Sequence, residues 1–249
     1  MNRFFACLAI LLLGAMPASA QPAVCDDPEA ACILDAAWGA ALLLPEETRV
    51  RLEPAFLEIA HLSSNAQVLA KWEARFDRKA EHSKTYPDYG WATAEPILAS
   101  RGVDGLIDLA RQRAGPVSVG RADVLLAAGK HFRDTDPQNA NRLNQVLFDL
   151  MRTASKFEKP VLAHAAAELA MIRCDAVTLS RAISITESPN SLRYAFWRAR
   201  IDGTSVGLVN RIRNIGSIDD TREIRRILDG YRAILEHGYC PVSKSEIGG

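Results

Sequence analysis

The sequence predicts an all-α protein of about a dozen short antiparallel helices, forming a repeat-like right-handed α-solenoid or a compact helical array. Apolar residues recur at helical spacing along most of the chain. Proline, glycine and capping residues separate these apolar stretches at short intervals. No stretch shows the strict apolar–polar alternation of a half-buried strand. These three observations together indicate helices joined by short connections, which makes sequential helices antiparallel neighbours.

The region 136–203 is the clearest example of this pattern. Asp136 provides a capping carboxylate, and Pro137 occupies a first turn where its missing N–H costs nothing. The helix that follows carries one apolar stripe, made by Leu143, Val146, Leu147, Leu150 and Met151. Further helices are expected after a break at Lys159-Pro160, over 177–183, and from a second cap-and-proline start at Ser188-Pro189 to a stop at Gly203.

The other expected helices follow the same signals in chain order. The first covers 29–43, and the second starts at Pro45 and is kinked or divided by Pro54. Ser64 or Asn65 caps the third. An interruption occupies 81–90, and three aromatic residues lie within 86–91; an aromatic loop there either binds a ligand or anchors itself to the protein body. The remaining helices are expected over 92–100, 103–113, 118–132 and 219–237, the last stopped by Gly238.

The N-terminus has the pattern of a cleaved secretory signal over 1–20. A basic start precedes an apolar run of roughly a dozen residues and an Ala18-Ser19-Ala20 exit. That run is shorter than the roughly 20 residues that a membrane-spanning helix needs, although a retained anchor is the alternative. We therefore expect one helical domain over 21–240, with a flexible tail over 241–249, in the bacterial periplasm or secreted.

Four cysteines lie beyond the signal segment: Cys25, Cys32, Cys174 and Cys240. An even number in an exported protein favours disulfides, and four cysteines allow three pairings. The preferred pairing joins Cys25 to Cys32 near the start of the fold, and Cys174 to Cys240 across the second half of the chain. The alternative is four separate buried thiols.

The chain carries 30 basic and 30 acidic residues. This balance argues against nucleic acid or anionic lipid as the partner. Arginines nevertheless concentrate in the C-terminal third, which makes that region a candidate binding surface; a solvated helix face is the alternative. The candidate binding residues are Arg193, Arg198, Arg200, Arg211, Arg213, Arg222, Arg225 and Arg226.

Catalytic and metal-binding patterns are near misses. The segment 115–120 does not have the spacing of a serine nucleophile elbow, and 128–131 lacks the first glycine of a phosphate-binding loop. Glu58 and His61 share a helical face, as do His164 and Glu168, but neither pair completes a metal site. No catalytic residue, metal or cofactor is therefore assigned.

Two segments resemble the helices of degenerate tetratricopeptide-like arrays in bacterial exported proteins. One is 45–60, in which an arginine precedes a Leu-x-x-Ile-Ala ending, and the other is 165–182, similar to the hinge between paired helices. The resemblance covers about half of the chain and lacks the strict 34-residue pattern of the family. It implies stacked helix pairs whose surface recognises proteins or peptides.

The function that these features favour is binding rather than catalysis. The expected protein is a scaffold or adaptor in the periplasm whose partner is another envelope protein or a peptide. One alternative is a hydrolase of cell-envelope glycan, which needs two carboxylates about 5–9 Å apart across a cleft. Carboxylates for that role could be drawn from Glu95, Glu168 and Glu187. A second alternative is a helical bundle that encloses a small apolar ligand.

Overall fold

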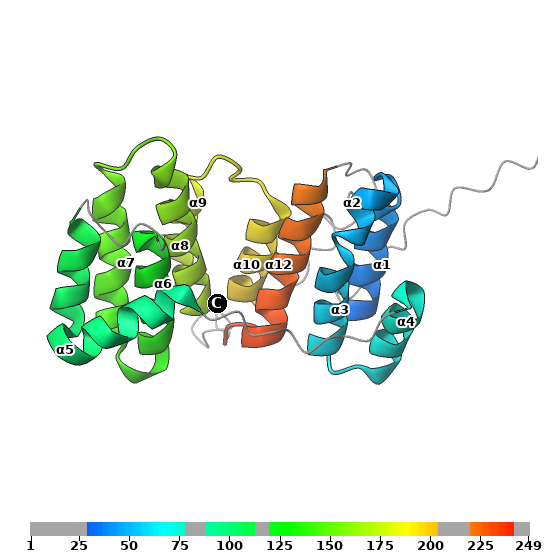
Figure 1. Ribbon diagram of the computed structural model, residues 1–249, viewed down its shortest axis with the longest axis horizontal. Helices are drawn as coiled ribbons and strands as arrows, with labels where there is room; N and C mark the ends of the chain where they lie inside the picture. Colours follow the sequence, from blue (N-terminus) through cyan, green and yellow to red (C-terminus); the bar gives the residue numbers. More distant parts are fainter. Residues whose placement is uncertain (1–28, 78–87, 113–119, 204–219, 242–249) are drawn as a thin grey trace, which may run out of the picture.

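The computed structural model describes residues 29–77, 88–112, 120–203 and 220–241, and all regular structure within these ranges is helical (Figure 1). The predicted all-α fold is therefore confirmed. The helices are α1 (Ala30–Ala41), α2 (Glu46–Val50), α3 (Glu53–Leu62), α4 (Ala66–Phe76), α5 (Tyr89–Arg111), α6 (Arg121–Thr135), α7 (Pro137–Met151), α8 (Glu158–Ile172), α9 (Ala176–Ile183), α10 (Leu192–Asp202) and α12 (Thr221–His237).

The helices lie side by side in an elongated row whose order differs from their order in the sequence (Figure 1). Helices α5 to α9 occupy one end, α10 and α12 the middle, and α1 to α4 the other end. The N-terminal helices thus pack on the last helix. Polar contacts mark this junction: Arg232 Nη1 lies 3.2 Å from Glu58 Oε1, and Arg225 donates to the Arg51 carbonyl at 3.1 Å.

Two apolar clusters fill this row. The first joins α5 to α9 and includes Tyr194 and Trp197 of α10, whereas the second joins α1, α3 and α4 to residues of α10 and α12 such as Phe196 and Ile227. Both α10 and α12 contribute to both clusters, so this helix pair connects the two halves of the core. The pair crosses closely at Gly230, where a Cβ atom would lie 2.9 Å from the Arg193 Cα atom.

Four aromatic rings form the centre of the second cluster. Phe56 and Trp72 stack with their centroids 5.0 Å apart, and Trp38 meets Phe76 edge-on at 5.2 Å. Phe56 and Trp72 are completely buried. Because these rings come from α1, α3 and α4, their contacts hold the three N-terminal helices together.

Most predicted helix boundaries are confirmed. Asn65 Oδ1 accepts hydrogen bonds from two N–H groups of α4, and Asp136 Oδ1 accepts one from α7. Pro54 lies in the first turn of α3, just after α2 ends, so it divides the two helices as expected. Gly102 has φ +65° and interrupts α5 where two separate helices were predicted.

Three boundaries were wrong. α5 begins at Tyr89 and is capped by Asp88, which accepts from the Trp91 N–H at 3.1 Å, so Tyr89 and Trp91 belong to the helix and not to an aromatic loop. The break predicted at Lys159-Pro160 lies a few residues earlier, over 152–157: α8 already begins at Glu158, and Pro160 falls in its first turn, where N–H groups have no intrahelical partner anyway. Ser188-Pro189 does not start α10, because the cap is Ser191 and the Leu192 N–H donates to Glu223 Oε1 of α12 at 2.8 Å. A contact between distant helices thus fixes the start of α10.

The disulfide between Cys174 and Cys240 is confirmed, with Cα atoms 5.8 Å apart. Cys25 lies outside the described residues, so its pairing with Cys32 stays a prediction. The signal segment 1–20 and most of the predicted tail also lie outside them. In the described ranges, no helix has both the length and the apolar character required to cross a bilayer.

Candidate functional site

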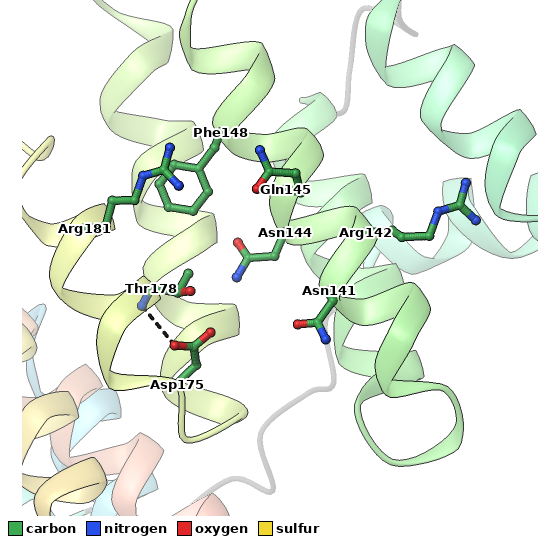
Figure 2. A pocket seen from close by; sticks show the side chains of 8 residues that line it. All are labelled: Asn141, Arg142, Asn144, Gln145, Phe148, Asp175, Thr178 and Arg181. Carbon is green, nitrogen blue, oxygen red and sulfur yellow. Dashed lines mark hydrogen bonds between the residues drawn. The ribbon is translucent and has the colours of Figure 1, made fainter.

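A pocket of about 360 Å³ opens between α7 and α9 (Figure 2). We call it the amide pocket, because three of its side chains are amides presented by α7 at helical spacing. Its lining comprises Asn141, Arg142, Asn144, Gln145, Phe148, Asp175, Thr178 and Arg181. The pocket exists because α7 and α9 both pack on α8 and so face each other across it.

Asn144 is the unusual member of this lining. Its side chain is directed from α7 toward α9 in Figure 2, and only 4% of the residue is exposed. Its Oδ1 atom is buried and has no hydrogen-bond partner in the part of the chain that the structure describes. An unsatisfied buried acceptor costs about 1–3 kcal/mol, so the fold tolerates a destabilising group at the base of the pocket.

The other side chains give the pocket a fixed shape. The Arg181 guanidinium lies 4.2 Å from the Phe148 ring centroid, a cation–π geometry that covers a buried ring with an exposed cation. Asp175 caps α9 by accepting from the Thr178 N–H at 2.9 Å. Arg142 points away from the pocket in Figure 2 and pairs with Asp104 of α5 at 2.5 Å.

A second pocket, of about 200 Å³, lies among α6, α8, α10 and α12, and we call it the central pocket. Lys130 and Glu168 pair across it at 2.5 Å, and Arg193 pairs with Asp229. Burial by itself would raise the pKa of Glu168. The charge and hydrogen bond of Lys130, together with His164 and Arg193, lower it by more than that. The pKa is therefore below its usual value, and the group is a carboxylate.

His164 connects these charges in the central pocket. Its Nε2 atom lies 3.2 Å from the Arg193 Nη1 donor, and its Nδ1 atom lies 3.2 Å from the Tyr194 hydroxyl. Because a guanidinium only donates, Nε2 accepts and Nδ1 carries the hydrogen. Burial, followed by the charge of Arg193, lowers the pKa of His164, which agrees with a neutral ring.

Stability should therefore fall as the pH falls below about 6.5, the ordinary pKa of histidine. The pKa of His164 and that of His237 are both lowered, chiefly by burial. The unfolded chain then binds protons at a higher pH than the folded chain, so acidification favours unfolding. Denaturant midpoints at pH 7.5 and 5.5 test this expectation. His164→Gln should reduce the loss between the two values, and an unchanged loss would contradict the role of His164.

A third pocket, of about 660 Å³, adjoins the central one and shares Glu236 and His237 with it. We call it the arginine pocket, after Arg133, Arg173 and Arg200. Only 4% of Arg200 is exposed, and its hydrogen bonds fix it between α8 and the end of α12. Cys174 of the disulfide also lines this pocket.

The structure distributes the predicted arginine surface over several places. Arg193 lines the central pocket and Arg200 the arginine pocket. Arg198 is exposed on α10. The candidates on α10 therefore do not share one groove.

The remaining candidate arginines lie elsewhere. On α12, Arg222 pairs with Asp220 at 3.3 Å, Arg226 pairs with Glu223 at 3.0 Å, and Arg225 is exposed. Arg211 and Arg213 lie outside the described residues.

The amide pocket was missed by sequence reasoning. The available signal was the placement of Asn144 beside Leu143 and Leu147, on the buried stripe of α7.

Glu58 and His61, considered for metal binding, lie on α3, where Glu58 pairs with Arg232. Across the described part of the chain, no three His, Cys, Asp or Glu side chains gather as a metal site requires.

Comparison with known proteins gives no relative for this chain. No family model matches it, and neither a curated protein nor a solved structure does. The geometry of the three pockets is therefore the basis for any functional assignment.

Proposed function

We propose that this chain is a scaffold or adaptor protein of the bacterial envelope, and that it holds an extended peptide segment of its partner in the amide pocket. The observation that carries this proposal is the buried, unpaired Oδ1 of Asn144. A ligand N–H would satisfy this acceptor, which no group of the described residues does.

The chemistry of the lining fits a peptide backbone. A peptide group offers one donor and one acceptor, and an asparagine or glutamine amide presents the complementary pair. Asn144 and Gln145 are adjacent on α7, with Asn141 one turn earlier, so the amides follow the direction of the helix. Arg181 on Phe148 adds a flat cationic surface for a side chain of the bound segment.

The expected location supports an envelope partner. The secretory pattern over 1–20 predicts export, and a disulfide such as Cys174–Cys240 is typical of an oxidising compartment. The helix-pair resemblance noted in the sequence also implies protein or peptide recognition.

Asn144→Leu tests the proposal because it separates binding from stability. Leucine has a similar volume and removes the unpaired acceptor, so stability should stay unchanged or rise by about 1 kcal/mol. Partner binding should fall roughly 10- to 100-fold, because the peptide groups of the ligand lose their hydrogen bonds. Denaturant unfolding measures the change in stability. Titration with the partner segment, once crosslinking has identified it, measures the change in binding. A large loss of stability with unchanged binding would show that Asn144 is structural.

Asn139→Leu is the matched control. Asn139 lies on the same helix, outside the pocket, and its amide donates to Asp136 at 2.7 Å. This substitution should cost some stability and leave binding unchanged. Equal losses of binding in both variants would contradict a specific role for the pocket.

The partner itself is identified by in-cell photocrosslinking of the exported protein, followed by mass spectrometry. A crosslinking residue at position 145 probes the amide pocket, and one at 222 probes the exposed arginines of α12. We expect one dominant envelope protein from position 145, lost in Asn144→Leu. Crosslinking from position 222 and not from position 145 would show that the partner binds at the exposed arginines of α12 and not in the amide pocket.

The central pocket gives the glycan-hydrolase alternative one supporting observation. Burial raises the pKa of Glu236 above its usual value, whereas that of Glu168 is lowered. Two carboxyl groups whose pKa values shift in opposite directions within one pocket are the contrast that an acid and a base of glycosidic hydrolysis need. Against this, Arg232 pairs with Glu236 at 3.3 Å and Lys130 with Glu168. Loss of glycan cleavage in both Glu168→Gln and Glu236→Gln would establish the hydrolase.

The apolar-ligand alternative is not favoured, because these pockets are lined largely by polar side chains.

A further inference from the structure

The Cys174–Cys240 disulfide is held by a buried arginine. The Arg200 Nη1 atom donates to Cys240 Sγ at 2.7 Å and lies 3.2 Å from Cys174 Sγ. The same guanidinium donates to the carbonyls of Met171 and His237, at 2.7 and 3.2 Å. In return, the Cys240 N–H donates to the Arg200 carbonyl at 2.9 Å. One cation thus contacts both sulfurs and the backbone on either side of them.

Among the residues that the structure describes, this cation forms no hydrogen bond or ion pair with an anionic group. Its hydrogen bonds within the described residues go to carbonyls and sulfurs, and its Nε atom has none. Burial, and then the charge of Arg133, lowers the pKa of Arg200. A buried charge without a counter-ion is costly, because its desolvation is not offset. Reduction of the disulfide would supply the missing anion as a thiolate.

The two cysteines differ in burial. Cys174 is half-buried and belongs to the lining of the arginine pocket, so this pocket is the side from which a thiol can approach the disulfide. Cys240 is only 5% exposed and has the shorter contact with Arg200. Thiol–disulfide exchange requires an accessible sulfur for attack, and it proceeds faster when the departing thiolate is stabilised. Each requirement is met by a different cysteine.

We propose that Cys174–Cys240 is a thiol-exchange site of the folded protein, reduced by a protein dithiol that enters the arginine pocket. A thiolate of the dithiol attacks Cys174 Sγ, and the bond to Cys240 breaks. Cys240 leaves as a thiolate that pairs with Arg200. The second thiol of the dithiol then resolves the mixed disulfide, which leaves Cys174 reduced and the dithiol oxidised. The dithiol supplies the two electrons and becomes a disulfide. One of its protons ends on Cys174, and the other passes to solvent because Cys240 remains a thiolate. Arg200 is the positioning residue.

The direction of attack is tested on the unmodified protein with glutathione as the probe. The folded protein is incubated with reduced glutathione, quenched in acid and alkylated, and both cysteines are mapped by mass spectrometry. We expect glutathione on Cys174 and the alkyl group on Cys240. Glutathione on Cys240, an equal mixture, or exchange only in denaturant would overturn the proposal.

The role of Arg200 is tested by the thiol–disulfide equilibrium in dithiothreitol buffers. Arg200→Met removes the cation and should lower the equilibrium constant for reduction at least tenfold, which is a potential about 30 mV more negative. Arg200→Lys should retain most of the effect. Arg198→Met, an exposed arginine of the same helix, is the matched control. An unchanged equilibrium in a folded Arg200→Met variant would overturn the role of the cation, and the mapping in the unmodified protein holds even if that variant fails to fold.

Discussion

Replacing Trp72 by alanine is expected to lower the free energy of unfolding by about 3–5 kcal/mol. The ring is completely buried and contacts Trp38, Phe56 and Phe76, so its removal leaves a cavity where α1, α3 and α4 meet. Among the described residues its indole Nε1 has no hydrogen-bond partner, so the loss comes from ring packing and from the contact of the Arg75 guanidinium with the ring, 5.3 Å from its centroid. Denaturant unfolding followed by circular dichroism measures the change.

Phe157→Ala provides the control for Trp72→Ala. Phe157 is 78% exposed, so its removal should change stability by less than about 0.5 kcal/mol. A similarly small effect at Trp72 would show that the N-terminal helices contribute little to the folded state.

Gly230→Val is expected to cost about 3 kcal/mol, at the upper end for an overpacked site. The added Cβ would lie 2.9 Å from the Arg193 Cα atom and 3.1 Å from its carbonyl oxygen. These are backbone atoms, so α10 and α12 must move apart. Since both apolar clusters include this helix pair, the separation disturbs both halves of the core. Faster hydrogen exchange along α10 and α12 would accompany the lower denaturant midpoint.

Gly39→Ala is the matched comparison for Gly230→Val. Gly39 lies in α1, and an added Cβ meets nothing within 4 Å. Alanine in a helix interior is favoured over glycine by roughly 0.5–1 kcal/mol, so this variant should be more stable than the parent. Losses of equal size at both positions would indicate that the crossing at Gly230 is not tightly packed.

The helices and their caps could be predicted because they depend on residues a few positions apart. The stripe from Leu143 to Met151 lies on the buried face of α7, and Asp136 caps it as expected. The start of α10 could not be found in this way, because it depends on Glu223, which is 31 residues further along the chain. Local signals such as Ser188-Pro189 carry no information about such a partner.

The site was less predictable than the fold for the same reason. An asparagine among leucines on α7 indicates burial, but only the packed helices show that its Oδ1 atom has no hydrogen-bond partner among the described residues. Similarly, the composition of the C-terminal third shows that it is rich in arginine. Its division into a central pocket, an arginine pocket and exposed side chains depends on which helices pack together.

The packing of α1, α3 and α4 on α12 has a consequence for biosynthesis. The contacts between Glu58 and Arg232, and between Arg51 and Arg225, each join residues 174 positions apart. During synthesis from the N-terminus, the first helices emerge long before the segment that covers them. The apolar faces that α12 covers stay exposed until α12 itself has been made, and closing so long a loop is slow. Exposed apolar surface of this kind is prone to aggregation, so we expect a chaperone that binds the nascent chain to reduce aggregation during synthesis.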